Sequence, residues 1–392
     1  MLLLRTFQSF PQPKRSFPTN PAVSLHKRGI LMHSIKYVST DKQQHEFFAT
    51  VRKNVNQYFQ EKGISKQANG FMFLKTLGML AIYIVPFVLI LTITMPVWVA
   101  LLLSIIMGFG VAGVGMGVMH DAVHHSYSKK PWLNKLLGGT LYMLGANVLN
   151  WKVQHNILHH TYTNIEGLDE DIDAPGPLRL SEQQPLKKIH KYQYIHAFFF
   201  YGLLTITKLI LDFVQLKKYN EVGLTHAQNA NPKSEYVKMA FRKIAYLIIV
   251  IGLPLLVTNF MWWQVLLGFV IMHWTAGLIL SIIFQLAHIV EGAHQPIPTS
   301  EGTIENDWAV HQLKTTADFA RNSHFLNWYV GGLNFQIEHH LFPNICHIHY
   351  KKISPIVEKT AKEFGLPYNL KPTLLSALSS HVQRLKELGT AS

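Results

Sequence analysis

The sequence predicts an all-α integral membrane protein, in which four transmembrane helices form two hairpins and a cytoplasmic helical cap carries clusters of histidine. Three observations predict this class: few charged residues, two long uncharged segments, and an excess of histidine near the ends of those segments. Of the 392 residues, 48% are hydrophobic and only 15% are charged, whereas about 25% are charged in a typical soluble protein. This composition argues against a disordered chain, a fibrous protein, a coiled coil and an ordinary soluble enzyme.

The segments 76–119 and 244–290 contain no Asp, Glu, Lys or Arg. A single transmembrane helix needs about 20 apolar residues, so each segment is long enough for two crossings joined by a tight turn. Pro96 is the predicted turn in the first segment. Residues 258–259 are the predicted turn in the second, where a pair of tryptophans follows that favours the membrane interface.

Every Lys and Arg lies outside those two segments. Because Lys and Arg mark the cytoplasmic side of a membrane, we expect both termini and the cap to be cytoplasmic, at a bacterial inner membrane or the endoplasmic reticulum. A soluble domain with two long buried helical hairpins is the alternative. The expected parts are a basic tail (1–40), a cytoplasmic or interfacial helix (41–75), hairpin one (76–119), a cap with two histidine clusters (120–243), hairpin two (244–290) and a cytoplasmic C-terminal part with the third cluster (291–392).

Three further segments are expected at the membrane surface. Segments 136–149 and 195–211 are too short or too interrupted by glycine, His and Lys to span with ease, so we expect helices in or just under the inner interface. A re-entrant pair is the alternative. The spacing of apolar residues in 41–62 predicts a helix on the inner face of the membrane.

The N-terminal segment 1–40 is basic and contains no acidic residue. We expect a disordered tail, or an upstream start for which Met32 is the natural first residue. An organelle transit peptide is the alternative, since such peptides are basic and poor in acids.

Histidine is over-represented, with 22 residues, and eight of these fall in three clusters. Residues four apart lie on one face of a helix, so each cluster can aim two side chains at a common centre, and a doubled histidine widens the set. We therefore expect two metal ions close together. The clusters are His120-Asp-Ala-Val-His124-His125, His155-Asn-Ile-Leu-His159-His160 and Gln336-Ile-Glu-His339-His340.

His288 is a further candidate ligand, because it ends the last apolar segment at the depth of the first cluster and ionisable groups in membrane spans are functional by default. Imidazole binds zinc, copper, iron and nickel, so residue type does not select the metal. Metal-bound histidines usually donate their second N–H to a carboxylate or carbonyl. Candidate partners, for which a solvated acidic loop is the alternative, are Asp121, Glu338, Asp169, Glu170, Asp171 and Asp173.

The remaining histidines have plainer interpretations. His347 and His349 are expected at the surface near the site, and His273, within a span, is a packing or tunnel residue. Isolated histidines are expected to be exposed or packed; these are His45, His190, His226, His311 and His381.

The three clusters, their order and the two-hairpin layout resemble the membrane fatty acid desaturase family. The Gln336 that leads the third cluster, within Gly331-Gly-Leu-Asn-Phe-Gln-Ile-Glu-His-His-Leu-Phe-Pro343, is similar to the front-end, linoleoyl-CoA-type branch. This branch inserts a cis double bond between an existing one and the carboxyl end. The resemblance implies a di-iron centre with O2 as oxidant, and as ligands His120, His124 or His125, His155, His159, His160, His288, His339 and His340, with Gln336 as a ligand or a neighbour.

The sequence departs from many front-end desaturases because it lacks the His-Pro-Gly-Gly haem motif of a fused cytochrome b5 domain. The resemblance then implies that electrons come from a separate carrier, a ferredoxin or a cytochrome b5 with its reductase. The expected partners are a CoA-linked or lipid-linked fatty acyl substrate and the lipid bilayer, with no nucleic acid. Glycines in the second span, from Gly108 to Gly117, either leave room for an acyl chain or serve close helix packing.

Two rival functions remain at this stage. The nearer is another di-iron membrane enzyme, a fatty acid or alkane hydroxylase, which uses similar clusters. The more distant is a membrane metal carrier or sensor without catalysis, for which polar residues should line a path through the spans.

Overall fold

The computed structural model describes residues 35–39, 41–173 and 176–390, so most of the predicted tail lies outside the described residues. This part of the chain is mostly helical. Its sheets are two short parallel pairs, in which Lys36 is paired with Thr303 and Ala317 with Asn369. The four strands are β1 (Lys36–Tyr37), β2 (Thr303–Ile304), β3 (Ala317–Phe319) and β4 (Asn369–Lys371).

Four helices are long and apolar enough to cross a membrane, as the sequence predicted, with mean hydropathy between 2.0 and 2.4. Two of them contain breaks in which short helical segments follow one another. The four are α2 (Gly70–Thr92); α3 (Val97–Val114) continued by the π-helical η1 (Gly115–Met119) and α4 (His120–Val123); α11 (Pro232–Leu247) continued by the π-helical η5 (Ile248–Gly252) and α12 (Leu253–Val257); and α13 (Trp262–His288).

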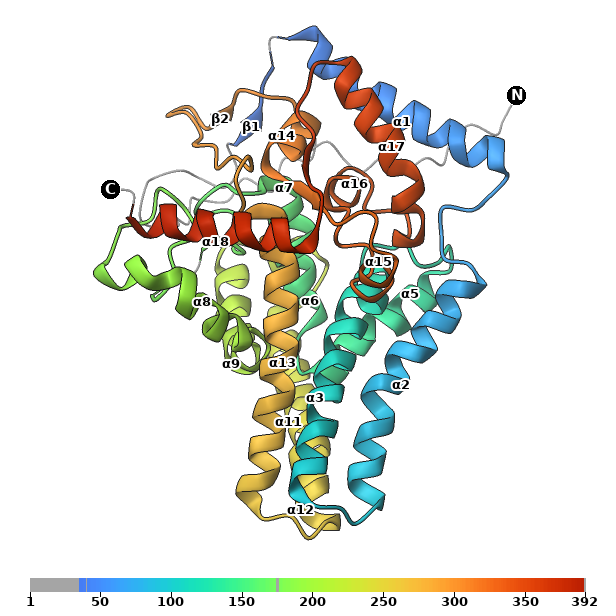
Figure 1. Ribbon diagram of the computed structural model, residues 1–392, viewed down its shortest axis with the longest axis vertical. Helices are drawn as coiled ribbons and strands as arrows, with labels where there is room; N and C mark the ends of the chain where they lie inside the picture. The colour runs from blue at the N-terminus through green and yellow to red at the C-terminus, as the bar shows by residue number, and fades with distance from the viewer. Residues whose placement is uncertain (1–34, 40, 174–175, 391–392) are drawn as a thin grey trace.

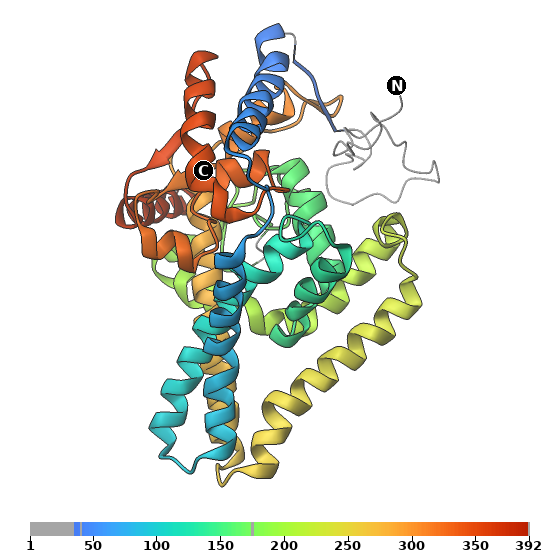
Figure 2. The same cartoon turned by 90° about the vertical axis from the view of Figure 1, so that its right-hand side faces the viewer.

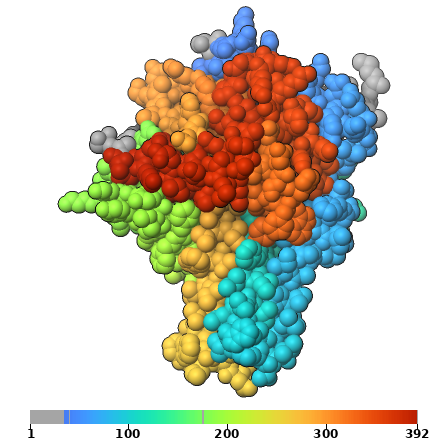
Figure 3. Space-filling model, viewed as in Figure 1, coloured from blue at the N-terminus to red at the C-terminus, as the bar shows by residue number. Residues whose placement is uncertain are grey.

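The predicted turn positions are confirmed. Pro96 precedes α3, and residues 258–261 separate α12 from α13. Both turns lie at the same narrow end of the molecule (Figure 1), and the space-filling view shows how this end widens into the rest of the chain (Figure 3). Helices α2, α3 and α13 run close together, whereas α11 diverges from them away from the turns (Figure 2).

Two spans begin earlier than the uncharged segments suggested. Helix α2 starts at Gly70 and contains Lys75, and α11 starts at Pro232 and contains Lys243. Both lysines are buried and bind partners inside the protein, so neither has to end the helix. The Lys243 ammonium donates to Asp212 Oδ2 at 2.7 Å, which joins α11 to α9 (Leu204–Glu221).

The segments expected at the membrane surface are helical. Segment 136–149 falls in α5 (Pro131–Gly138), the 3-10 helix η2 (Gly139–Leu144) and the start of α6 (Val148–Trp151). Segment 195–211 falls in α8 (Gln193–Gly202) and α9, which meet at a bend of 75°. This bent pair has the geometry of a broken span or a re-entrant loop.

Helix α1 (Lys42–Lys62) occupies the predicted segment, but its apolar face packs on the protein rather than being left for a membrane surface. Asp41 caps its N-terminus by accepting the N–H of Gln43. The helix lies at the end of the molecule opposite the turns (Figure 1). Its buried side chains share a core with α14 (Trp308–Thr315), α16 (Gln336–Leu341) and α17 (Tyr350–Glu363); they are Phe47, Val51, Val55 and Phe59.

Short helices and a long C-terminal helix complete the fold. Helix α18 (Leu374–Thr390) packs against α8 and α13. The others are the π-helical η3 (Lys152–His159), α7 (His160–Tyr162), the 3-10 helices η4 (Lys188–Tyr192) and η6 (His347–His349), α10 (Leu224–Ala227) and α15 (His324–Tyr329).

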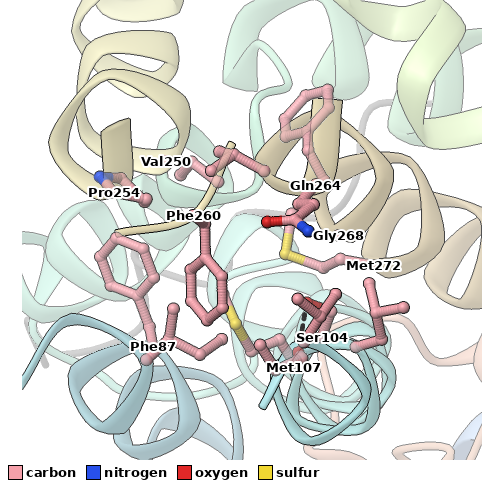
Figure 4. A pocket seen from close by; sticks show the side chains of 15 residues that line it. Phe87, Ser104, Met107, Val250, Pro254, Phe260, Gln264, Gly268 and Met272 are labelled. Carbon is pink, nitrogen blue, oxygen red and sulfur yellow. Dashed lines mark hydrogen bonds between the residues drawn. The ribbon is translucent and has the colours of Figure 1, made fainter. Parts of the chain in front are cut away.

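A small, largely apolar pocket lies between α2, α3, α12 and α13 near the turns (Figure 4). Two polar side chains line it, and both have partners nearby: the Ser104 hydroxyl donates to the Ala100 carbonyl, and Gln264 Oε1 accepts the Met261 N–H. The cavity therefore suits an apolar occupant. Its lining includes Phe87, Met107, Phe260 and Met272.

The glycines of the second span serve close helix packing. A Cβ at Gly110 would lie 2.5 Å from the backbone nitrogen of Tyr83, and one at Gly108 would lie 2.6 Å from Thr275 Cβ. These glycines let α3 approach α2 and α13 too closely for any side chain. The space suggested for an acyl chain at these two positions is filled by neighbouring helices.

This contact gives a first prediction. Gly110→Ala should push α2 and α3 apart and lower the free energy of unfolding by about 1–3 kcal/mol. Gly78→Ala is the matched control, because a Cβ on that glycine of α2 meets nothing within 4 Å and alanine favours a helix. Thermal unfolding in detergent checks this, and equal melting temperatures would contradict it.

Candidate metal centre

The structure brings together eight of the ten predicted site residues at the ends of α4 and α13 that lie away from the turns. All eight are buried histidines, contributed by α4, η3, α7, α13 and α16. Seven of them form two groups, each with ring nitrogens within 4.8 Å of one another. The first histidine group is His120, His124, His155 and His339, and the second histidine group is His159, His288 and His340.

The second histidine group is arranged as a set of metal ligands. Each ring donates its Nδ1–H outward: His159 to Asp169 at 3.1 Å, His340 to Gln312 Oε1 at 2.8 Å, and His288 to the Thr315 carbonyl at 3.3 Å. The three Nε2 atoms are buried and have no hydrogen-bond partner among the described residues. Unpartnered lone pairs that converge in this way, each backed by an acceptor, fit a bound metal ion.

The first histidine group converges through its Nε2 atoms. His155 Nε2 lies 3.1 Å from His120 Nε2 and 3.4 Å from His339 Nε2. The Nε2 of His124 is buried without a partner in the described chain. The indole of Trp151 packs against His120, His124 and His155 and forms an apolar wall for this group.

His160 lies between the two groups. Its Nε2 is 3.0 Å from His339 Nε2 and 3.3 Å from His155 Nε2, and its ring stacks on His340 with the centroids 4.5 Å apart. Gln336, one turn before His340 on α16, is fully buried, and neither polar atom of its amide has a partner in the part of the chain described. Both residues are therefore placed to complete a ligand set.

Local helix geometry decides how each doubled histidine is used. Hydrogen bonds in a π-helix run from i to i+5, so η3 turns both His159 and His160 toward the side of His155. The first cluster instead reaches the end of α4. There His125 has a left-handed backbone with φ of 59° and is exposed, so His124 joins the first group and His125 does not.

Burial favours the neutral form of an imidazole, which is the form that binds metal. Desolvation and the neighbouring histidines hold the pKa of His124, His155 and His339 well below the usual range, and the same holds for His160 and His340. His159 differs: burial lowers its pKa, but the Asp169 carboxylate outweighs burial and raises the pKa to about 8.

The carboxylates near the clusters have different roles. Asp169 and Asp171 both lie against His159 Nδ1, at 3.1 and 3.4 Å. Glu170 accepts from Lys218 and Tyr219 instead, and Asp173 Oδ1 accepts the Gly167 N–H.

Glu338 points away from the histidines. Its Oε1 lies 2.8 Å from the Tyr368 hydroxyl, which also contacts Asp318. Burial and the Asp318 carboxyl hold the pKa of Glu338 well above its usual range. Glu338 therefore anchors α16.

The expectation that His347 and His349 lie at the surface is wrong. His347 is buried and contacts Asp121 Oδ2 and Lys75 Nζ, both at 2.8 Å. His349 is buried against the Gln67 carbonyl. Sequence patterns gave no sign of this, because the segment that follows Pro343 looks like a loop and its partners lie more than 200 residues away.

Gln312 was also missed. It supplies the acceptor for His340 but sits in α14 without any motif around it. For His273 the sequence allows two roles, in packing or in lining a tunnel. The structure places its ring in hydrogen-bond contact with the Tyr246 hydroxyl at 2.8 Å and the Thr205 hydroxyl at 2.9 Å. This buried histidine is satisfied as a packing residue.

Comparison with known proteins decides the family. The family model for fatty acid desaturases matches residues 96–372, more than two thirds of the chain. The chain belongs to the fatty acid desaturase family. This confirms the resemblance found in the sequence.

Several curated relatives support the same family. An sn-1 linoleoyl-lipid 6-desaturase of Synechocystis sp. is 36% identical over 357 residues, covering 89% of this chain and 97% of that protein. Acyl-lipid (8-3)-desaturases of Physcomitrium patens and Mortierella alpina are 34% and 33% identical, covering 89% and 88% of this chain and 73% and 78% of those proteins. As a member of this family, the protein is an oxidoreductase that acts on acyl lipids.

The doubled histidine of the first cluster gives a second prediction. His124→Ala should lose bound metal, because it removes a ligand from the first histidine group. His125→Ala should keep its metal, since that side chain is exposed. Metal per folded chain, measured by mass spectrometry on the purified protein, checks the pair, and equal loss in both variants would contradict it.

Proposed function

We propose that this protein is an O2-dependent front-end acyl-lipid desaturase with a di-iron centre. The observation that carries the proposal is the pair of buried, inward-facing histidine groups on a fatty acid desaturase fold. Two irons held by these groups would supply the activation of O2 that the removal of two hydrogens from adjacent carbons of the acyl chain requires. Two external electrons and two protons then complete the reduction of O2 to two waters.

The protein contributes the metal ligands, fixes the orientation of their rings and excludes water from the site. The first group would hold one iron through His120, His124, His155 and His339, and the second group would hold the other. His160 would complete the first set or act between the two sets, and Gln336 would hold a ligand water or bind directly. Asp169, Gln312 and the Thr315 carbonyl keep the second group in one tautomer with Nε2 free. Burial of all these rings excludes water from the reacting carbons. The ligands of the second group are His159, His288 and His340.

The acyl chain is proposed to pass beside the aromatic wall of the centre. Trp151 packs on three rings of the first group, and Phe284 of α13 meets His155 edge-on with centroids 5.7 Å apart. Apolar walls with few polar groups are typical of sites that hold lipids. The lipid-linked form of the substrate, and a new bond on the carboxyl side of an existing one, are inferred from the names of the relatives.

The membrane arrangement is proposed from charge and geometry together. The four spans form two hairpins with their turns outside, and the rest of the chain is a cytoplasmic cap that carries the centre. The concentration of Lys and Arg away from the turns supports this sidedness. The proposed electron donor is a ferredoxin or a cytochrome b5 with its reductase.

Product analysis tests the reaction. A host without polyunsaturated fatty acids should express the chain and be fed oleate, linoleate or α-linolenate, with double bonds located by gas chromatography–mass spectrometry. We expect a new double bond on the carboxyl side of the existing one. His340→Ala should abolish the product, whereas His226→Ala, which changes an exposed histidine of α10, should retain it.

Three outcomes would contradict this proposal. Hydroxylated products would assign the protein to the hydroxylase alternative. A new bond on the methyl side would exclude front-end chemistry. No product from protein that holds its full iron, supplied with either ferredoxin or cytochrome b5, would exclude desaturation of these acyl chains.

Sidedness is tested by cysteine labelling, since Cys346 is the only cysteine and is buried. Thr94→Cys places a thiol in the exposed turn between α2 and α3, and Glu301→Cys places one in an exposed loop after α13. A membrane-impermeant maleimide should label position 94 in intact cells, and position 301 only after permeabilisation. The reverse pattern would refute the proposed topology.

A further inference from the structure

Lys75 is a buried lysine in the first span that the metal centre described above does not use. Only 3% of its surface is exposed. Its Nζ lies 2.8 Å from His347 Nε2, and a Cβ at Gly117 would come within 3.2 Å of it. The lysine therefore fits into a space that the neighbouring helix leaves by having no side chain at position 117.

The hydrogen bonds of this lysine fix the tautomer of His347. A lysine ammonium can only donate, so His347 Nε2 accepts and its proton sits on Nδ1. That Nδ1–H donates to Asp121 Oδ2 at 2.8 Å, and the backbone N–H of His347 points at the same oxygen at 3.3 Å. The bonds thus run in one direction, from α2 through η6 to α4.

Asp121 connects His347 with the first histidine group, because its carboxylate also lies near His120. Its other oxygen, Oδ1, lies 4.0 Å from His120 Nδ1, which is buried and has no hydrogen-bond partner among the described residues. His120 Nε2 faces the group. A shift of about 1 Å would bring Nδ1–H and the carboxylate within hydrogen-bond distance.

The second histidine group has a simpler arrangement. Asp169 receives the Nδ1–H of His159 directly and is held by the backbone N–H of Asn164 at 2.8 Å. Each group thus has its own carboxylate, but the carboxylate of the first group is held by His347 and Lys75.

We propose that Lys75 is a positioning residue for the first histidine group, acting through His347 and Asp121 on His120, so that metal bound by this group depends on Lys75 while metal bound by the second group does not. The inference rests on the proposed function, because it needs both groups to hold iron. It assigns the buried lysine a role beyond the stability of the span.

The test is the iron content of Lys75→Met, purified in detergent and loaded with ferrous iron. We expect two irons per chain in the natural protein and one in the variant, with the Mössbauer signal of a single site. Asp169→Asn should weaken iron at the other site about 10- to 100-fold. The double variant should hold neither iron tightly.

Lys243→Met is the matched control. It also removes a buried lysine from a span and leaves the Asp212 carboxylate without its partner, but it lies outside both groups. It should lower the melting temperature and still hold two irons. Loss of iron there equal to that in Lys75→Met would reduce the role of Lys75 to general stability and overturn the proposal.

Two substitutions of His347 separate its contact with Lys75 from its contact with Asp121. They test the proposal if Lys75→Met fails to fold. An asparagine amide occupies the position of Nδ1 and can still donate to Asp121, whereas a glutamine amide occupies the position of Nε2 and keeps only the contact with Lys75. Because the proposal needs both contacts, His347→Asn and His347→Gln should each lose the first iron and keep the second. A His347→Asn variant that holds two irons would show that the contact with Lys75 is not needed and would overturn the proposal.

The outcomes distinguish this inference from the proposed function. Natural protein that binds no iron refutes the di-iron function. Natural protein with two irons, together with a Lys75→Met variant that holds two irons with an unchanged spectrum, refutes only the role of Lys75. Loss of both irons in Lys75→Met refutes the selectivity for the first group.

Discussion

The structure depends on keeping eight imidazole rings buried and facing inward. Buried polar atoms without partners are costly, and lone pairs that converge in this way fit a bound metal ion. In the second group, hydrogen bonds therefore hold the outward-facing Nδ1 atoms. His159 and His340 show the pattern, with Nδ1–H bonded to Asp169 and Gln312 and Nε2 left free. Most of the contacts around the centre serve this orientation.

Helix ends and π-helical segments make this crowding possible. A regular α-helix separates adjacent side chains by about 100°, and on α16 this turns His339 to the first histidine group and His340 to the second. The π-helical η3 brings His159 and His160 to the side of His155, while the end of α4 turns His125 out to solvent. The same sequence pattern is thus used in two ways, according to the backbone beneath it.

The sequence alone predicted the four spans, both turns and the three histidine clusters, because hydropathy and local spacing carry that information. It did not predict the choice between His124 and His125, since a π-helix and a helix end look alike in a pattern of residues. It also placed α1 on a membrane surface, because an apolar stripe on a helix can pack equally well against a membrane or against other helices. Lys75 was counted among the basic residues that flank a span, and its partner His347 lies 272 residues further along the chain.

The misses at α1 and at Lys75 share a cause, because each involves a contact between segments far apart in sequence. The contact of Lys75 with His347 also links the membrane part to the metal centre. Helix α2 lies where Gly110 lets its backbone approach at Tyr83, and this position sets how far Lys75 reaches toward His347. The geometry of the first histidine group then depends on packing within the spans, whereas the second group depends on Asp169 and its loop. A change in helix packing would therefore act on one half of the centre before the other.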